Sequence, residues 1–278
     1  MLQADYRLLV PRAQTARRPD SCPTARGHTV PNLPEFRNAI LAELPAEEMD
    51  ALRVHLEPVD LPLGFIIVSA GEPVDYVYFL ERGLGSIVVV TPAGKRAEAG
   101  MFGSEGFAPT SPAVGLHVSF PEVIIQSPGS GHRIGVLAFC TALAKCPVFL
   151  QRVQRVSHNL ATQASYTALS NGVHKTDVRL ARWLLMCQDR VGGEIIITHD
   201  YISMLLAVRR PSVTEALHVL EGEGFISSKR KLVSVRNRAA MGLFARDAYG
   251  QPEEEYRLLF EAVGELGLHD RLPVPADM

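Results

Sequence analysis

Between residues 54 and 135 the sequence repeats one arrangement, a short run rich in β-branched residues followed by a glycine or a proline. The runs occupy residues 65–68, 74–80, 86–90, 123–126 and 132–134, and the punctuating residues include Gly64, Gly71, Gly83, Gly94, Pro128 and Gly129. Short strands separated by turn residues are typical of an antiparallel sandwich or roll, because tight turns join each strand to its neighbour. We therefore expect an antiparallel β-roll within residues 33–146.

A long helix is predicted after the roll. Pro147 suits the first turn of a helix, and Asn171-Gly172 is a strong stop, so the helix should cover residues 147–172. One stripe along it recurs at alternating steps of three and four residues: Val153, Val156, Leu160, Gln163 and Thr167. Two copies of the helix would pair along this stripe as a short coiled-coil-like dimer seam. The alternative is that the same stripe packs the helix on its own domain.

The segment after residue 194 has the element order of a winged helix-turn-helix. Residues 195–197 read as a strand, Thr198 as the N-cap of a helix that runs to about Leu206, and a second helix follows a tight turn. Two short strand candidates, residues 225–227 and 232–235, then flank a basic hairpin tip. Strand, helix, turn, helix and hairpin together predict a winged DNA-binding unit.

The second helix of this unit has two unlike faces. Val213, Ala216, Leu217 and Leu220 recur at helical spacing and form a face to be buried. The opposite face carries Pro211, Thr214, Glu215 and His218, which are short or polar. Side chains of this kind suit close approach to the base edges of a DNA major groove.

Basic residues stand at both ends of this candidate interface. Arg209 and Arg210 lie at the helix start, where recognition helices make most of their contacts, and Pro211 should hold Arg210 in extended backbone just before the helix. The hairpin tip supplies phosphate contacts. The full set predicted to bind double-stranded DNA is Arg209, Arg210, Ser212, Thr214, Glu215, His218, Lys229, Arg230 and Lys231.

Charge is distributed unevenly along the chain. The net charge is −2, yet residues 33–140 hold six basic and thirteen acidic residues, whereas residues 197–238 hold seven basic and four acidic ones. A local positive potential attracts phosphates whatever the overall charge, so an anionic partner is expected at residues 197–238.

At this point the sequence resembles a known family. ITHDYISMLLAVRRPSVTEALHVLEGEGFISSKRKLVSV, TDVRLARWLLMCQDR and the roll segment that begins LEPVDLPLGF are similar to the catabolite-activator and anaerobic-regulator (Crp/Fnr) family of bacterial transcription regulators. The resemblance implies an α+β fold with a cyclic-nucleotide-binding-type β-roll, a long dimerisation helix and a C-terminal winged helix-turn-helix. It also implies a homodimer, with RNA polymerase as a further candidate partner. A location in the cytoplasm is expected because no apolar run has the length of a membrane span and Pro11 interrupts the early run Leu8-Leu9-Val10.

The resemblance divides the chain into five parts. They are a flexible tail (residues 1–32), the sensor-like roll (33–146), the dimerisation helix (147–172), the DNA-binding unit (173–238) and a C-terminal helical extension (239–278). Two departures from the family pattern, Pro211 and Glu215, stand at base-reading positions, so no family operator sequence can be transferred to this chain. Ala207 replaces the usual glycine in the turn, a mild cost if that position needs a positive φ.

Control by a cyclic nucleotide is not expected. Glu105 is a candidate effector-pocket residue, since family members place a glutamate on the ribose. The stretch PTSPAVGLHVSFPEVIIQSPG that follows contains no arginine or lysine for the cyclic phosphate, which would lose its strongest contact. A small-molecule effector of another kind, or none, fits this sequence better. A sensor that responds to nucleotides remains an alternative.

A rival from another class is a metal-dependent, cupin-like enzyme, because antiparallel rolls also house such sites. His117, Glu122 and His132 would be its ligands, although their spacing lacks a close His-x-His pair. The spacing of the four cysteines, Cys22, Cys140, Cys146 and Cys187, does not match that of metal ligands, so we expect no metal and no cofactor. We also expect no enzymatic activity. No membrane span is expected, because no apolar run is long enough.

Overall fold

The computed structural model describes residues 36–261, so the predicted tail, Cys22 and residues 262–278 lie outside the described part. Two short helices come first, α1 (Ala39–Ala42) and α2 (Ala46–Arg53). Asn38 caps α1 by accepting from Ile40 N and donates from Nδ2 to the carbonyl oxygens of Leu80 and Gly106, at 3.1 and 2.8 Å. These bonds fasten α1 to the roll.

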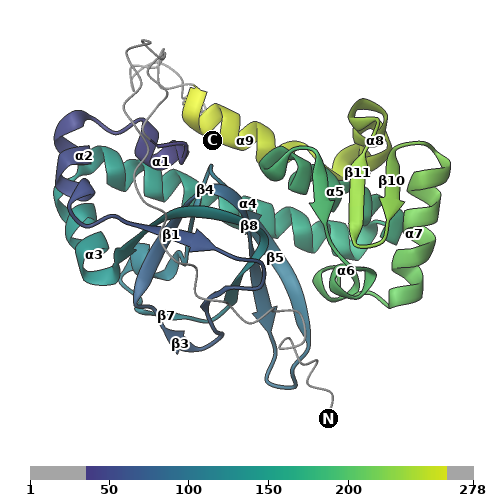
Figure 1. The fold of residues 1–278 in the computed structure, drawn as a ribbon, viewed down its shortest axis with the longest axis horizontal. Helices are drawn as coiled ribbons and strands as arrows, with labels where there is room; N and C mark the ends of the chain where they lie inside the picture. Colours follow the sequence, from purple (N-terminus) through teal and green to yellow (C-terminus); the bar gives the residue numbers. More distant parts are fainter. Residues whose placement is uncertain (1–35, 262–278) are drawn as a thin grey trace, which may run out of the picture. The chain divides into compact units, whose positions relative to one another are not determined.

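The predicted antiparallel roll is confirmed, and Figure 1 shows its strands beside the long helix. Its strands are β1 (Glu57–Leu61), β2 (Ile66–Val68), β3 (Glu72–Pro73), β4 (Tyr76–Val90), β5 (Arg96–Phe102), β6 (Phe107–Ala108), β7 (Val118–Ser119) and β8 (Glu122–Gly135). The main sheet has the order β1-β8-β4-β5, with β2 on β8 and β6 on β4, and β3 pairs with β7 in a second small sheet. A short 3₁₀ helix, η2 (Ser111–Val114), precedes β7.

Two of the predicted turn glycines lie inside strands instead. The sequence suggested separate strands on either side of Gly83 and of Gly129, but β4 and β8 run through both positions. A Cβ atom on Gly83 would meet Ser127 O at 2.7 Å, and one on Gly129 would meet Arg82 O at 2.0 Å. These glycines therefore serve close approach of two bulged strands, where the register shifts, and not a chain reversal.

The helices α3 (Val136–Lys145) and α4 (Pro147–Val173) close the roll. The predicted long helix thus ends one residue beyond the expected position. Both carboxylate oxygens of Glu48 accept from the first amides of α4, Val148 N at 3.0 Å and Phe149 N at 2.8 Å, which satisfies donors that have no intrahelical partner. The apolar contact under these helices is a cluster of aromatic rings, Phe79, Phe107, Phe139 and Phe149.

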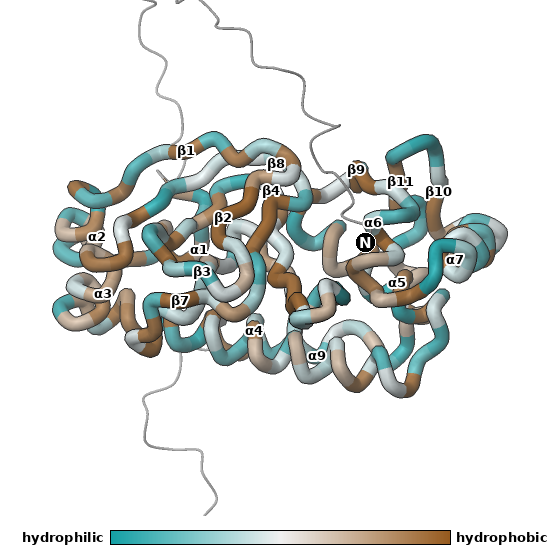
Figure 2. Tube along the Cα trace, turned by 90° about the horizontal axis from the view of Figure 1, so that it is seen from below, coloured by the Kyte–Doolittle hydropathy of each residue, from teal (hydrophilic) through white to brown (hydrophobic). Residues whose placement is uncertain are grey.

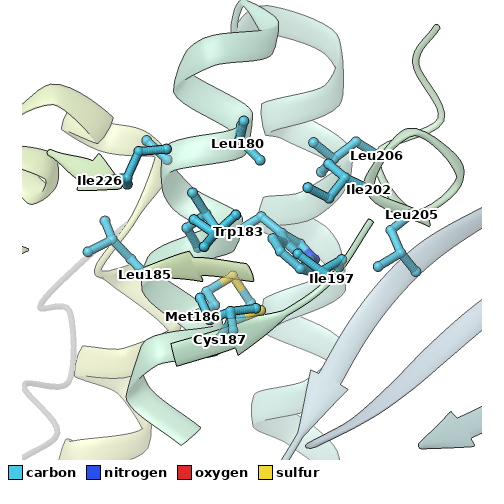
Figure 3. Close-up of a cluster of buried hydrophobic side chains, with 14 of the residues drawn as sticks. Leu180, Trp183, Leu185, Met186, Cys187, Ile197, Ile202, Leu205, Leu206 and Ile226 are labelled. Atoms are coloured by element: carbon cyan, nitrogen blue, oxygen red, sulfur yellow. The ribbon is translucent and has the colours of Figure 1, made fainter. Parts of the chain in front are cut away.

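The predicted winged helix-turn-helix follows α4. It consists of α5 (Thr176–Val191), β9 (Glu194–Ile196), α6 (His199–Leu205), α7 (Arg210–Gly222), β10 (Ile226–Lys229) and β11 (Leu232–Val235), with the strands in the order β10-β11-β9. Figure 3 shows its core, in which Trp183 and Leu180 of α5 lie among Ile202, Leu205 and Leu206. Leu84, Val88, Met101 and Ile124 of the roll belong to the same cluster, so the roll and this unit share one apolar contact.

The C-terminal extension contains α8 (Arg238–Ala245), the 3₁₀ helix η3 (Arg246–Ala248) and α9 (Gln251–Glu261). Met241 and Ala245 are buried in the DNA-binding core. Helix α9 runs beside α4 (Figure 2), where Asn159 Nδ2 donates to Pro252 O at 2.7 Å and Tyr256 packs with the roll-side cluster. The extension therefore contacts both halves of the described chain.

Within residues 36–261 no single helix has both the length and the apolar character of a membrane span. Helices α3 and α4 together have that length and composition, but they meet at a bend of 113°.

Candidate nucleic-acid interface

Helix α7 presents the two faces that the sequence predicts. Val213, Ala216, Leu217 and Leu220 are buried in the core shared with α5. On the other side Arg209, Arg210, Pro211, Glu215 and His218 are exposed, and Ser212 and Thr214 are half-buried. The predicted base-reading residues therefore lie along one accessible surface.

The start of α7 differs from the prediction by one residue. Arg209, with φ −74° and ψ 143°, is the extended cap, and Arg210 is already helical. Proline disfavours helical backbone in the preceding residue without forbidding it, and here the tight turn from α6 decides the geometry. Both guanidinium groups remain at the positive end of the helix dipole, where an anionic phosphate is attracted.

Ala207 in the turn has a positive φ of 51°, the backbone conformation for which glycine is preferred. The turn is held by hydrogen bonds from Ala207 N to Met204 O (3.2 Å) and from Val208 N to Ser203 O (3.0 Å). Ala207→Gly should therefore raise the free energy of unfolding by up to about 1 kcal/mol, because relief of the left-handed strain exceeds the greater flexibility of the unfolded chain. Urea unfolding would measure it, and equal or lower stability would contradict it.

Two contacts from α6 fix side chains of α7. Asp200 Oδ1 lies 2.8 Å from Arg210 Nε, and both side chains are largely exposed, at 75% and 63%. His199 Nδ1 lies 3.2 Å from Thr214 Oγ1. The sequence prediction missed His199 and Asp200, and the available signal was their place in the first turn of a helix that begins at the Thr198 cap.

The wing is a hairpin with a two-residue tip. Lys229 pairs with Leu232, so Arg230 and Lys231 form the turn, with a φ of 61° at Lys231. All three basic residues are exposed, and Figure 2 shows the hairpin tip as strongly hydrophilic. The tip and the end of β10 therefore carry three cationic side chains on the same compact unit as α7.

The stripe of α4 that was predicted to form the dimer seam faces the interior of its own chain. Val153, Val156 and Gln163 are buried inside this chain, with exposed fractions of 0%, 3% and 1%. Leu160 packs against the roll-side cluster, and Thr167 Oγ1 accepts from Arg182 at 3.1 Å. The stripe therefore packs the helix on its own chain, which is the alternative stated for it, and Gln163 bonds to the backbone of Met101 in β5.

A second stripe on α4 remains exposed. Its residues recur at alternating steps of four and three: Gln154, His158, Ala161, Ser165, Ala168 and Gly172. Helix α9 lies along one flank of this stripe, where Glu255 Oε1 is 3.1 Å from His158 Nε2. Most of the members are small, which allows two helix backbones to approach closely.

Glu105 lines a cavity, but its carboxylate is not free. Its oxygens accept from Gly103 N at 3.1 and 3.0 Å, and Oε1 accepts from Arg190 Nε of α5 at 2.6 Å. This carboxylate joins the roll to the DNA-binding unit. A cavity of about 360 Å³ lies beside it, lined by residues of α4, α5 and the extension.

The three residues of the rival metal site are not brought together. Glu122 pairs with Arg96, His132 Nδ1 lies 3.4 Å from Glu81 Oε1, and His117 is exposed. Across residues 36–261 no group of three or more His, Cys, Asp or Glu side chains has a geometry able to hold a metal ion.

A buried polar chain connects the roll to α5. Glu98, 7% exposed, accepts at Oε1 from Trp183 Nε1 at 2.9 Å. Ser86 Oγ lies 2.6 Å from Glu98 Oε2 and 2.5 Å from Gln126 Oε1. A serine hydroxyl has one proton and cannot donate to both acceptors, so a protonated Glu98 that donates to Ser86 completes the chain.

The pKa of Glu98 agrees with a protonated carboxyl group. Burial raises the pKa of Glu98 from 4.5 to about 7, although its hydrogen bonds with Ser86 and Trp183 and the charges of Arg182 and Arg190 lower it. A carboxyl group that loses hydration favours its neutral form.

Comparisons with known proteins agree with this architecture. Residues 178–243 match the model of the Crp-like helix-turn-helix domain. A curated relative from Mycobacterium tuberculosis, described as a CRP-like cAMP-activated global transcriptional regulator, is 26% identical over an alignment of 208 residues that covers 70% of this chain and 91% of the relative.

Solved structures show the same fold. A putative Crp/Fnr-family regulator from Eubacterium rectale has a TM-score of 0.60 at 14% identity. The match covers 76% of this chain and 99% of the chain of that regulator. A CRP-family regulator from Thermus thermophilus has a TM-score of 0.57 at 20% identity, with 69% and 98% covered.

Proposed function

We propose that the chain is a regulator of the Crp/Fnr type and that it is a homodimer that binds specific sites on double-stranded DNA. The observation that carries the proposal is the exposed polar face of α7 beside a basic wing on one unit. A helix reads base edges in the major groove while a flanking basic hairpin neutralises phosphates. RNA polymerase is proposed as a further partner of the protein. No enzymatic activity is proposed.

The homodimer is proposed to form through the exposed stripe of α4. Its alternating steps of four and three match the spacing of a helix pair, and its small residues suit close packing. A two-fold dimer places two recognition helices about one DNA turn apart, so the operator is expected to be an inverted repeat.

Cyclic AMP is proposed not to control this protein, in contrast to the description of the mycobacterial relative. Glu105 is already bonded to Gly103 and Arg190, and residues 109–129 contain no basic side chain other than His117. A cyclic phosphate would be bound there without a charge-assisted hydrogen bond from arginine or lysine, which is the strongest kind available to it.

The test is selection of duplexes from a random pool, with and without cyclic nucleotide, followed by titrations with two variants. Arg210→Ala should cost about 1–3 kcal/mol of binding free energy at the selected site and relax one base position, because a bidentate base contact is lost. Arg230→Ala should weaken specific and random duplexes alike and make the salt dependence shallower, because it removes a phosphate contact.

Arg53→Ala in α2 of the roll removes the same charge outside the DNA-binding unit and serves as the control. The proposal fails if no sequence is enriched from the pool at low ionic strength. The roles of Arg210 and Arg230 are wrong if both variants bind selected and random duplexes as the wild type does.

A further inference from the structure

The ion pair between Asp200 and Arg210 lies at the start of α7, where a recognition helix makes most of its contacts with DNA. Arg210 is the first residue of α7, and Asp200 lies in the first turn of α6, so the pair bridges the two helices at their N-terminal ends. The contact is 2.8 Å long and joins Oδ1 to Nε. Both side chains are exposed, so the pair lies on the accessible surface and not in the core.

Which nitrogen is engaged decides what the arginine can still do. A guanidinium group has five N–H donors, and in this ion pair the carboxylate oxygen lies nearest to Nε and not to either terminal nitrogen, which together carry the other four. Those terminal N–H groups form the planar fork that fits the O6 and N7 acceptors of guanine. The carboxylate of Asp200 therefore attracts the Nε side of the Arg210 guanidinium, and the terminal N–H groups can be directed at a base.

Stability does not explain this pair. An exposed ion pair between two surface side chains contributes little to folding, because water screens the charges and both side chains lose freedom. A carboxylate at a DNA-binding surface also repels phosphates, which weakens binding to every duplex. The dipole of α6 accounts for an acidic residue in its first turn, but not for the contact of that residue with Arg210. A contact with little benefit for folding and a general cost for DNA affinity has its clearest use in discrimination between sequences.

We propose that Asp200 is a positioning residue that holds Arg210 for guanine and disfavours its contact with a backbone phosphate. This inference depends on the proposed DNA-binding function and adds a specificity-determining residue to it. Asp200 itself contacts no base in the proposal; it acts through the direction that it imposes on the Arg210 guanidinium.

The test compares Asp200→Asn with the wild type on the selected duplex and on a random duplex. Discrimination between the two should fall by about tenfold, which is the order of one well-oriented base contact. Affinity for the random duplex should rise, and its salt dependence should steepen by about one phosphate contact, because Arg210 becomes free to bind phosphate. A repeated pool selection should show lost preference at the base position that Arg210→Ala also relaxes.

Three further variants make the result decisive. Asp200→Glu should restore part of the discrimination, because it keeps a carboxylate within reach of Arg210. Glu223→Gln removes one exposed negative charge at the other end of α7 and should leave base preference unchanged. In the double variant Asp200→Asn with Arg210→Ala, the effect of the Asp200 change on base preference should disappear.

The possible failures can be told apart. If the wild type selects no sequence, the proposed function fails and Asp200 is not implicated. If the wild type is selective and Asp200→Asn keeps the same base preference, only the inference on Asp200 is overturned. An equal rise in affinity in Asp200→Asn and Glu223→Gln with unchanged discrimination also overturns it, since charge alone then explains the change.

Discussion

Replacement of Glu98 with glutamine should stabilise this protein at pH 8 by up to about 3 kcal/mol while changing its stability little at pH 5. The pKa of Glu98 is about 7 in the folded chain and 4.5 when unperturbed. The folded state therefore keeps a proton that the unfolded chain has released between these values. Each tenfold difference in proton affinity is worth about 1.4 kcal/mol, so the free energy of unfolding falls as pH rises through this window.

Glutamine avoids this loss because it is neutral throughout. Its amide oxygen can accept from Trp183 Nε1, and its amide nitrogen can donate to Ser86 Oγ, as the protonated acid does. Urea unfolding at several pH values would give the comparison. Glu72→Gln, at an exposed position of the roll, should leave the pH dependence of the wild type in place. Parallel pH curves for Glu98→Gln and wild type would show that Glu98 is ionised in the fold.

A pair of glutamates on the exposed stripe of α4, Ala161→Glu with Ser165→Glu, should convert the proposed dimer into monomers. A two-fold helix pair would bring these charges against their own copies in a seam with little water, which costs several times the energy of an exposed pair. Affinity for the full inverted repeat should fall by at least about 100-fold, because the two half-sites no longer bind together. Affinity for an isolated half-site should stay the same.

Sedimentation and duplex titration would measure these two outcomes. Val153→Ala, on the buried stripe, is the matched control and should lower the free energy of unfolding by about 2 kcal/mol with the dimer retained. If the double glutamate variant remains dimeric, the seam lies on another surface. If Val153→Ala dissociates the dimer in a folded protein, the buried stripe is part of the seam after all.

The long helix illustrates what could be predicted from sequence. Its start followed from Pro147, because proline acts locally on the backbone, whereas the helix runs through the predicted stop at Asn171-Gly172 and ends at Val173. Its partner did not follow, since the stripe of Val153, Val156 and Gln163 has the same spacing for any apolar surface. The small residues Ala161 and Ser165 gave no signal, because nothing local distinguishes a solvent-facing position from a close helix contact.

The same limit applies to the interface. The exposed face of α7 was predictable because burial of Val213 and Leu217 fixes the direction of the opposite side. The contact of Asp200 with Arg210 was not, since it depends on how α6 and α7 approach across the turn at Ala207. Gly83 and Gly129 were assigned to turns for a similar reason. A glycine in the sequence does not show whether a turn or a closely packed neighbouring strand requires it.

The C-terminal extension brings the chain back to the helix from which the DNA-binding unit departs. Helix α8 is embedded in that unit through Met241, and α9 is fastened to α4 through Asn159. The same unit also shares an apolar cluster with the roll and is tied to it by Arg190 and Glu105. With all these contacts in place the unit has little freedom to turn against the rest of its chain, so operators with altered half-site spacing should be poorly tolerated.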